Sequence, residues 1–346
     1  MYITRHVQEV PSALSGTVLA IGNFDGLHLG HQALLAHAKD VARTSSKPLA
    51  VMTFEPHPRH FFRPDLPPGN LFSFREKIEN LSALGVEYVH AVPFGRSFSD
   101  LSAQQFIERI LMQAHRVSHV VTGSDFVFGH DRGGNSALLQ TYAGQGAFGY
   151  TAFTPLAGKD ENKISSTRIR TLLADGNPDE AAQLLGRPYA ISGRVIHGDK
   201  RGRAFGFPTL NMTLKNRFVP KFGIYAVTVK ECDSAFHGAS SRRAPETIHT
   251  QGQQTDTALS AFHGASSRRA PETIYKGVAN LGIRPMYRLD MPLLETHLFD
   301  MTGDWYGKRL SVELRHYIRE EMRFDSEAKL KEQMQADGEH ARSLLV

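Results

Sequence analysis

Two histidines three residues apart, His28 and His31, are the first side chains in this sequence whose type and spacing suggest chemistry. They follow the apolar run Thr17–Ile21 and a turn containing glycines, at the expected start of a helix. A helix start favours a phosphate, and two imidazoles on one helix face can donate hydrogen bonds to its oxygens. In this turn Gly22, Gly26 and Gly30 are spaced four apart and do not form the dinucleotide fingerprint G-x-G-x-x-G, and the phosphate loop G-x-x-x-x-G-K-[ST] does not occur in the chain. A zinc site on the same pair is the alternative, but no third and fourth ligand stands at a suitable spacing.

The stretch from Gly22 to His31, GNFDGLHLGH, resembles the HxGH signature of the nucleotidyltransferase superfamily, which transfers adenylyl or cytidylyl groups. The resemblance implies that the histidines steady the charge that builds on the α-phosphate of ATP while pyrophosphate leaves. Such a transfer asks the protein mainly for positioning and electrostatic stabilisation. By the same resemblance, ATP contacts fall to Gly22, Phe24 and Gly30, and further substrate or metal contacts to Asn23 and Asp25.

A second polar segment, ISSTRIR at residues 164–170, begins another expected helix. Alone, its hydroxyls are typical of an ordinary Ser/Thr helix cap. It also resembles the ISSTxxR element of the same superfamily. Combined with the histidine motif upstream, the resemblance implies that Ser165, Ser166 and Thr167 reach the triphosphate of ATP and that Arg170 neutralises it.

Between these motifs, residues 123–135 read GSDFVFGHDRGGN and resemble the G-x-D/N-F-x-F-G-x-x-R-x-G segment of bacterial FAD synthetases. The resemblance implies a pocket for the flavin nucleotide and the adenine. Another family-like piece, TFEPHP at residues 53–58, ends a strand over the same sheet edge. The residues implied to bind the flavin are Asn23, Asp125, Phe126, Phe128 and Arg132, the last of them as a phosphate ligand.

The second half carries GRVIHGDKRGRAFGFPTLNM at residues 193–212. As a bare pattern, a turn rich in Gly and Arg is most often a solvated hairpin. The whole string resembles the riboflavin kinase signature, which implies that Thr209 and Asn211 bind Mg²⁺ and the ATP phosphates. Mg²⁺ keeps waters and uses few protein ligands, so this small set suits it. The resemblance also places Gly198, Lys200 and Gly206 beside the nucleotide.

Further along, GVANLGIRP and LETHLFD also match the kinase family. An isolated glutamate on an alternating strand is usually exposed to solvent. Here the match implies that Glu295 is the catalytic carboxylate, which accepts the proton of the ribityl 5′-hydroxyl as it attacks the γ-phosphate. The chain departs from the family at Met286, where a threonine is common, and in an insertion before Tyr275.

The motif residues of the first half must be positioned by strands and helices, and apolar runs alternate with helical patterns in this part of the sequence. Strands alternating with helices predict a doubly wound, Rossmann-like α/β domain, which binds ligands at the carboxyl ends of its strands. The expected strands are Thr17–Ile21, Leu49–Phe54, Glu87–Val92 and His119–Thr122, and the expected helices are Gln32–Arg43, Phe74–Leu84, Ala103–Ala114, one that starts at ISSTRIR, and Pro178–Leu185.

The second half changes to short β-rich runs broken by Gly and Pro. Many short strands with turn signals predict an antiparallel β-barrel or sandwich, and the resemblance implies a barrel of the riboflavin kinase type. A C-terminal helix is expected over Ser326–Leu345. The expected strands are Ala190–Ile196, Ile224–Lys230, Tyr275–Asn280, Leu293–Phe299 and Leu310–Tyr317.

We expect the domain boundary near Leu185–Pro188, which gives an adenylyltransferase domain of residues 1–185 and a kinase domain of residues 186–346. The string SAFHGASSRRAPETI occurs at 234–248 and again at 260–274. Two identical copies are not typical of a solenoid, which needs three or more repeats. We interpret the duplication as a surface loop insertion between two strands. A basic docking site presented twice is the alternative.

Composition narrows the class of protein. Hydrophobic residues are 41% and charged residues 22% of the chain, which is typical of a globular protein. No apolar run approaches the ~20 residues of a membrane span, the N-terminus lacks a signal-peptide pattern, and Cys232 is the single cysteine. These features favour the cytoplasm. A net charge of +5 without long basic runs favours phosphorylated small molecules over nucleic acid.

The motifs extend from about Gly16 to Phe324, in the order of the bacterial bifunctional riboflavin kinase/FMN adenylyltransferase (FAD synthetase) family. The resemblance implies that the chain converts riboflavin to FMN and FMN to FAD with ATP and Mg²⁺, as a monomer or weak homo-oligomer. Two alternatives remain. One is another cytidylyl- or adenylyltransferase with an unrelated β module. The other is a flavin-binding regulatory protein.

Overall fold

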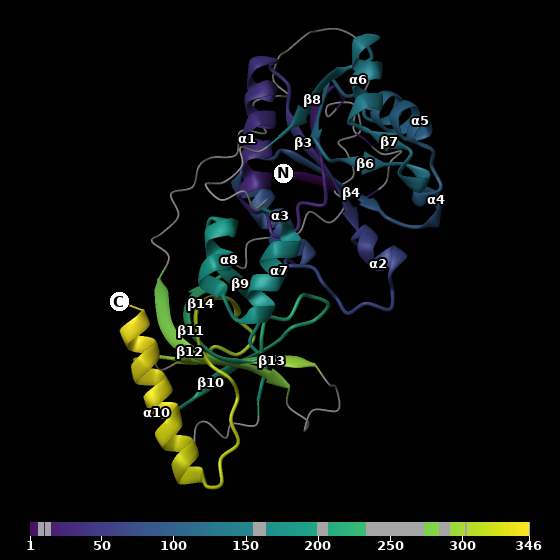
Figure 1. Cartoon of the computed structure of the whole chain (residues 1–346). Coiled ribbons are helices and arrows are strands. Elements are labelled where there is room, and N and C mark those ends of the chain that lie inside the picture. Colours follow the sequence, from purple (N-terminus) through teal and green to yellow (C-terminus); the bar gives the residue numbers. More distant parts are fainter. Residues whose placement is uncertain are drawn as a thin grey trace.

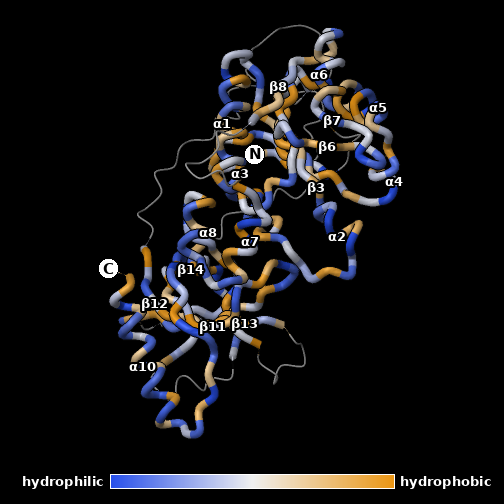
Figure 2. The backbone as a smooth tube through the Cα atoms, viewed as in Figure 1, coloured by the Kyte–Doolittle hydropathy of each residue, from blue (hydrophilic) through white to orange (hydrophobic). Residues whose placement is uncertain are grey.

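The computed structural model describes residues 1–5, 10, 15–154, 164–198, 207–232, 273–283, 291–301 and 303–345. Two sheets dominate these residues, and two helices lie between them (Figure 1). Apolar segments gather along the strands of both sheets (Figure 2). In the described part of the chain, no helix is long and apolar enough to cross a membrane. Nearly all of the duplicated segment lies outside the described residues.

The first sheet is parallel throughout, with the strand order β1-β4-β3-β2-β5-β8. The central strand β2 is buried on both faces, since Leu19 and Ile21 enter one apolar cluster while Val18 and Ala20 enter another. The predicted doubly wound α/β class is therefore confirmed. The strands are β1 (Tyr2–Thr4), β2 (Val18–Ile21), β3 (Leu49–Glu55), β4 (Tyr88–Pro93), β5 (His119–Gly123) and β8 (Gly149–Phe153).

Helices cover both faces of this sheet. The helix expected over Ala103–Ala114 is present, but most of it has π-helical geometry. A short two-stranded sheet follows β5. The elements are α1 (Leu29–Thr44), α2 (Pro58–Phe62), α3 (Phe74–Ala83), α4 (Arg96–Ser99), α5 (Ala103–Gln105), η3 (Phe106–Ala114), β6 (Val127–Phe128), η4 (His130–Arg132), β7 (Gly134–Asn135) and α6 (Ser136–Gly144).

The second sheet is antiparallel, with the order β10-β13-β12-β11-β14-β9. A bridge from Ile196, just after β9, to Asn211 in β10 joins the two edges and closes the sheet toward a barrel. The predicted antiparallel β module and its C-terminal helix are confirmed. The elements are β9 (Tyr189–Arg194), β10 (Thr209–Thr213), β11 (Gly223–Glu231), β12 (Ile274–Ile283), β13 (Pro292–Leu298), β14 (Arg309–Arg319) and α10 (Glu327–Leu344).

Helices α7 (Ser166–Asp175) and α8 (Pro178–Leu185) connect the two sheets. Their buried residues Ile169, Leu173 and Leu185 belong to the same apolar cluster as Val227 in the antiparallel sheet. These helices therefore pack on the second module, although they precede the expected domain boundary near Leu185–Pro188. The position of that boundary stays a prediction.

Candidate active sites

The loop after β2 and the first turn of α1 hold the two histidines. His28 is the N-cap of α1, and its Nδ1 atom accepts a hydrogen bond of 3.3 Å from the backbone N–H of His31. The two rings stack with 3.7 Å between centroids, and the Phe24 ring meets His31 edge-on at 5.3 Å. The structure thus makes the pair one rigid unit at the carboxyl edge of the sheet.

Burial controls the charge of this pair. Loss of hydration lowers the pKa of His28 to about 4, although the Asp25 carboxylate opposes the shift. Burial, then the neighbouring His28 and Lys77, lowers the pKa of His31 well below its usual value. Both rings are therefore neutral near pH 7, and each has one N–H that can donate a hydrogen bond. Since His28 Nδ1 accepts a hydrogen bond, we assign its proton to Nε2.

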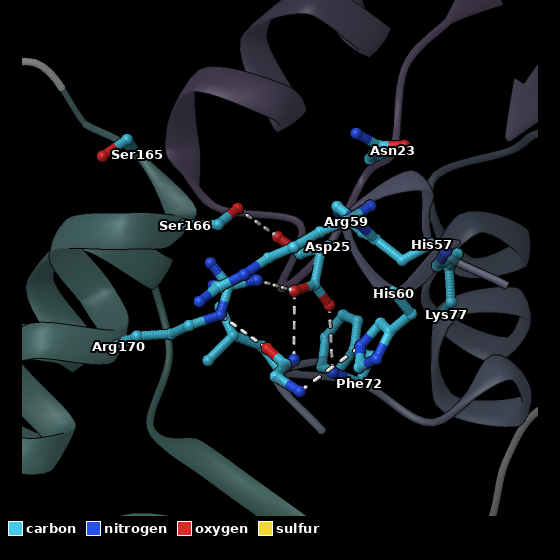
Figure 3. Close-up of polar contacts among 12 residues, drawn as sticks. Asn23, Asp25, His57, Arg59, His60, Phe72, Lys77, Ser165, Ser166 and Arg170 are labelled. Atoms are coloured by element: carbon cyan, nitrogen blue, oxygen red, sulfur yellow. Dashed lines mark hydrogen bonds and ion pairs between the residues drawn. The ribbon is translucent and has the colours of Figure 1, made fainter. Parts of the chain in front are cut away.

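Asp25 joins the two motifs of the first module (Figure 3). Its carboxylate accepts hydrogen bonds from the backbone N–H groups of Leu71 at 3.0 Å and Phe72 at 3.2 Å, and it forms an ion pair with Arg170. Arg170 Nε also donates to the Gly69 carbonyl at 2.5 Å, and Ser166 Oγ donates to the Asp25 carbonyl at 2.8 Å. The guanidinium expected at the triphosphate is thus held by Asp25 here.

The remaining hydroxyls of that motif lie beside this contact. Ser165 is the N-cap of α7 and accepts a 3.2 Å hydrogen bond from the backbone N–H of Arg168, so the capping role recognised in the sequence is present. Thr167 is exposed.

Residues at the end of β3 form a part of the site that the sequence reasoning largely missed. Thr53 Oγ1 donates to the Asn23 carbonyl at 3.1 Å and accepts from Lys77 Nζ at 3.3 Å. The Lys77 side chain is 4% exposed, lies 4.0 Å from the Glu55 carboxylate, and has its pKa lowered by burial. Burial also lowers the pKa of His57 to about 4. TFEPHP pointed to this edge, whereas nothing distinguished Lys77 from a surface lysine.

Two polar atoms at this edge are buried without a hydrogen-bond partner, Asn23 Oδ1 and His31 Nδ1. Buried polar atoms are rarely left unpaired in native proteins. Both atoms belong to residues that the sequence assigned to substrate binding. A hydrogen-bonding atom without a partner on each of them is what the binding of a ligand at this edge requires.

The predicted flavin-binding residues in the segment after β5 differ in how deeply they are buried. Phe126 and Phe128 stack at 5.4 Å, and Phe128 also meets Phe106 at 5.2 Å inside the apolar core. Phe126 is half-buried, whereas Asp125 and Arg132 are exposed. Phe128 therefore supports the loop from the core side, and the other three lie nearer its surface.

The second candidate site lies in the antiparallel module. A cavity of about 350 Å³ opens beside β10. In the register of the sheet, Asn211 in β10 lies opposite Glu295 in β13, and Glu295 lies opposite Asn280 in β12. The carboxylate and the two amides thus form one row across three strands. The cavity is lined by Gly198, Pro208, Thr209, Leu210, Asn211, Leu298, Met301, Gly303, Trp305 and Tyr306.

Asn211 is fixed by the chain that precedes it. Its carbonyl accepts a 2.9 Å hydrogen bond from the Ile196 N–H, and Gly198 lies so close that a Cβ atom there would be 2.3 Å from Asn211 Nδ2. Asn211 Oδ1 and Asn280 Oδ1 are both buried without a hydrogen-bond partner. The predicted residues Lys200 and Gly206, and the family departure at Met286, lie outside the described residues.

Comparisons with known proteins cover both modules. A family model described as FAD synthetase matches residues 10–168, and one described as riboflavin kinase matches residues 185–345. The bifunctional riboflavin kinase/FMN adenylyltransferase of Escherichia coli strain K12 is 39% identical over 343 residues, 99% of this chain and 97% of the relative. Its namesake in Haemophilus influenzae is 37% identical over 344 residues, 99% of each. A crystal structure titled macrolide-efflux protein from Streptococcus pneumoniae has a TM-score of 0.78 and 29% identity, over 98% of both chains.

Proposed function

Because the chain belongs to the family of bifunctional riboflavin kinases/FMN adenylyltransferases, we propose that the two sites described above perform the two reactions of that family. The chain is a bifunctional transferase with an FAD synthetase module followed by a riboflavin kinase module. The second module phosphorylates riboflavin with ATP to give FMN. The first transfers an adenylyl group from ATP to FMN, giving FAD and pyrophosphate.

For adenylyl transfer, we assign hydrogen-bond donation to His28 and His31. The neutral His28 ring presents its Nε2–H toward the α-phosphate, where charge builds as pyrophosphate leaves. The buried ammonium of Lys77, an electrostatic neighbour of His31, adds positive charge in the same region. Gly22 and Gly30 are assigned to the triphosphate from the sequence alone.

The other residues of the first module are assigned to support and to substrate contact. Ser166 and Arg170 hold the Asp25 loop in place, so we assign them to positioning; Arg170 uses Nε and Nη2 for Gly69 and Asp25, and we assign its Nη1 to phosphate. Phe24 fixes the His31 ring. Ser165 and Thr167 are assigned to the triphosphate. The residues assigned to the flavin are Asn23, Asp125, Phe126 and Arg132.

For phosphoryl transfer, the residues on β10 fit a magnesium ion bound with ATP. Asn211 offers a buried amide oxygen that has no hydrogen-bond partner, and Thr209 offers a hydroxyl in the lining of the same cavity. Oxygen ligands of this kind are those that Mg²⁺ takes, with phosphates and waters completing its shell. When bound, Mg²⁺ neutralises the charge of the transferring phosphoryl group. Thr209 and Asn211 would hold it, and Gly198 keeps Asn211 in place.

Glu295 is assigned as the general base. Its place opposite Asn211 in the β10–β13 register is the observation that carries the kinase proposal, because it sets a carboxylate beside the predicted magnesium ligand. The carboxylate would accept the proton of the riboflavin 5′-hydroxyl during attack on the γ-phosphate. Lys200 and Gly206 are assigned to the nucleotide from the sequence alone.

The cellular setting is also a proposal. The single Cys232 and the modest net charge of +5 support a cytoplasmic enzyme that acts on small molecules without nucleic acid. We propose residues 1–185 and 186–346 as the two modules, supported by family matches that end at residue 168 and begin at residue 185.

A product analysis tests these assignments. The protein is incubated with ATP and Mg²⁺ and with either riboflavin or FMN, and the flavins are separated by chromatography. Riboflavin should yield FMN and then FAD, and FMN should yield FAD. FAD from FMN without FMN from riboflavin would refute the kinase assignment, and no product from either flavin would refute both.

A further inference from the structure

We propose that Arg187, which lies at the start of the kinase module, is a positioning residue for adenylyl transfer in the other module. It belongs to the connection between α8 and β9, inside the stretch matched by the riboflavin kinase family model. Its guanidinium nevertheless reaches back to the loop that presents His28. The inference rests on the proposed role of that loop in adenylyl transfer.

The contacts of Arg187 are directed at the backbone immediately before His28. Its Nη2 atom donates to the Gly26 carbonyl at 2.7 Å, and its Nη1 atom donates to the Leu27 carbonyl at 3.2 Å. Nη1 also donates to the Leu185 carbonyl at 3.1 Å. The planar fork of a guanidinium can serve several acceptors at once, which an ammonium on a flexible stem does less well.

Gln32, in the first turn of α1, completes this arrangement. Its Nε2 atom donates to the Leu27 carbonyl at 2.8 Å and to the Leu185 carbonyl at 2.9 Å. Arg187 and Gln32 therefore share the same two acceptors. One acceptor, the Leu27 carbonyl, lies in the loop that presents His28, here called the catalytic loop, and the other lies at the end of α8. The connection between the modules is therefore tied to the turn that carries the histidines.

The loop needs such a restraint because its backbone is strained. Leu27 has a φ of 41° and Phe24 a φ of 48°, in the left-handed region that residues other than glycine rarely occupy. Such conformations persist only where the surrounding structure fixes them. The fork of Arg187 fixes the carbonyl of Leu27 directly, and the guanidinium also lies 5.1 Å over the Phe72 ring, which holds its plane.

Without Arg187, the Gly26 carbonyl loses this donor and the Leu27 carbonyl keeps only Gln32. The strained turn is then free to relax, and His28 follows it in the next residue. A displacement of about 1 Å at a catalytic group costs about 10²-fold in rate. Because riboflavin phosphorylation uses residues in the β-barrel, the loss should fall on one activity alone.

The experiment compares full-length wild type, Arg187→Ala, Arg187→Lys and Arg217→Lys. Arg217 is the matched control because it too crosses between the modules, to the Glu76 carboxylate, without touching the catalytic loop. Each protein is assayed for FAD formation from FMN, FMN formation from riboflavin, and melting temperature. Methylguanidinium is then added to Arg187→Ala, with methylammonium as the non-planar comparison.

We expect Arg187→Ala to lower the kcat of FAD formation about 10²-fold, with little change in the KM for FMN or ATP and kinase activity kept. Methylguanidinium should restore part of the lost rate and methylammonium should not, a response that a merely structural role would not give. Arg187→Lys, which keeps the aliphatic stem and the positive charge, should show a smaller selective loss of FAD formation. It replaces Arg187→Ala as the test if the alanine variant does not fold. Arg217→Lys should keep the ratio of the two activities.

Three results would overturn the proposal: wild-type FAD formation in both Arg187 variants, parallel loss of both activities, or the same selective loss in Arg217→Lys. Failure of methylguanidinium to restore any rate would also count against it. A wild-type protein that forms no FAD from FMN would refute the assigned function itself. This result is distinct from the ratio of FAD formation to FMN formation that is compared among the variants.

Discussion

Replacing Gly198 by alanine should selectively damage the kinase site, because this glycine backs directly onto Asn211. A Cβ atom at position 198 would lie 2.3 Å from Asn211 Nδ2 and 2.8 Å from its Cγ atom. Non-bonded heavy atoms sit best at about 3.5–4.0 Å, so the amide must retreat by roughly 1 Å. A shift of that size in a group that orients substrate costs about 10²-fold in rate. The displaced oxygen is the proposed magnesium ligand, so the variant should also require more Mg²⁺.

The assay follows FMN formation from riboflavin by chromatography over a series of Mg²⁺ concentrations, and FAD formation from FMN in the same preparation. Gly338→Ala is the control in the same module, since its Cβ atom would meet only Phe299 at an ordinary 3.8 Å. Gly338→Ala should match wild type, and Gly198→Ala should keep FAD formation from FMN. Wild-type kinetics and Mg²⁺ dependence in Gly198→Ala would refute the assignment of Asn211.

Two further predictions concern buried ionisable side chains in the first module. Asp25→Asn breaks the buried pair with Arg170, which should lower the free energy of unfolding by roughly 3–5 kcal/mol in a denaturant titration; unchanged stability would contradict it. Burial lowers the pKa of His115 to about 4, below its usual 6.5 in the unfolded chain, so its contribution to stability is full above pH 6.5 and is lost as the pH falls toward 4. The loss is about 3 kcal/mol, and His115→Gln should flatten the pH dependence of melting, whereas equal slopes would contradict the burial argument.

The sequence predicted the central strands well, because they carry local signals, whereas the roles assigned to the residues of the motifs stay predictions. Val18–Ile21 and Leu49–Glu55 are continuous apolar runs, and burial on both faces is what their pattern indicates. The edge strands Tyr2–Thr4 and Gly149–Phe153 were missed, since short strands at the edge of a sheet need little apolar sequence. Thr209–Thr213 was treated as part of a turn-like motif because its polar residues serve the cavity rather than a core.

The parts of the site that the sequence could not predict depend on contacts between distant segments. The burial of Lys77 follows from the packing of α3 against β3, and nothing in its neighbourhood along the chain marks it. The phosphate contact expected of Arg170 stays a prediction, and nothing in the sequence indicated its ion pair with Asp25, 145 residues away. Arg187 stands in an ordinary-looking Gly-Arg-Pro-Tyr string, and its role emerges only when the connection between the modules meets the catalytic loop.

The central claim is that two separate sites on one chain act in succession, and one paired measurement tests it most directly. Glu295→Gln and His31→Ala are each incubated with ATP and Mg²⁺ and with either riboflavin or FMN, and all flavins are quantified. Glu295→Gln should form no FMN from riboflavin but convert added FMN to FAD at the wild-type rate. His31→Ala should accumulate FMN from riboflavin and form no FAD. Loss of both reactions in either variant, or full FAD formation by His31→Ala, would contradict the account.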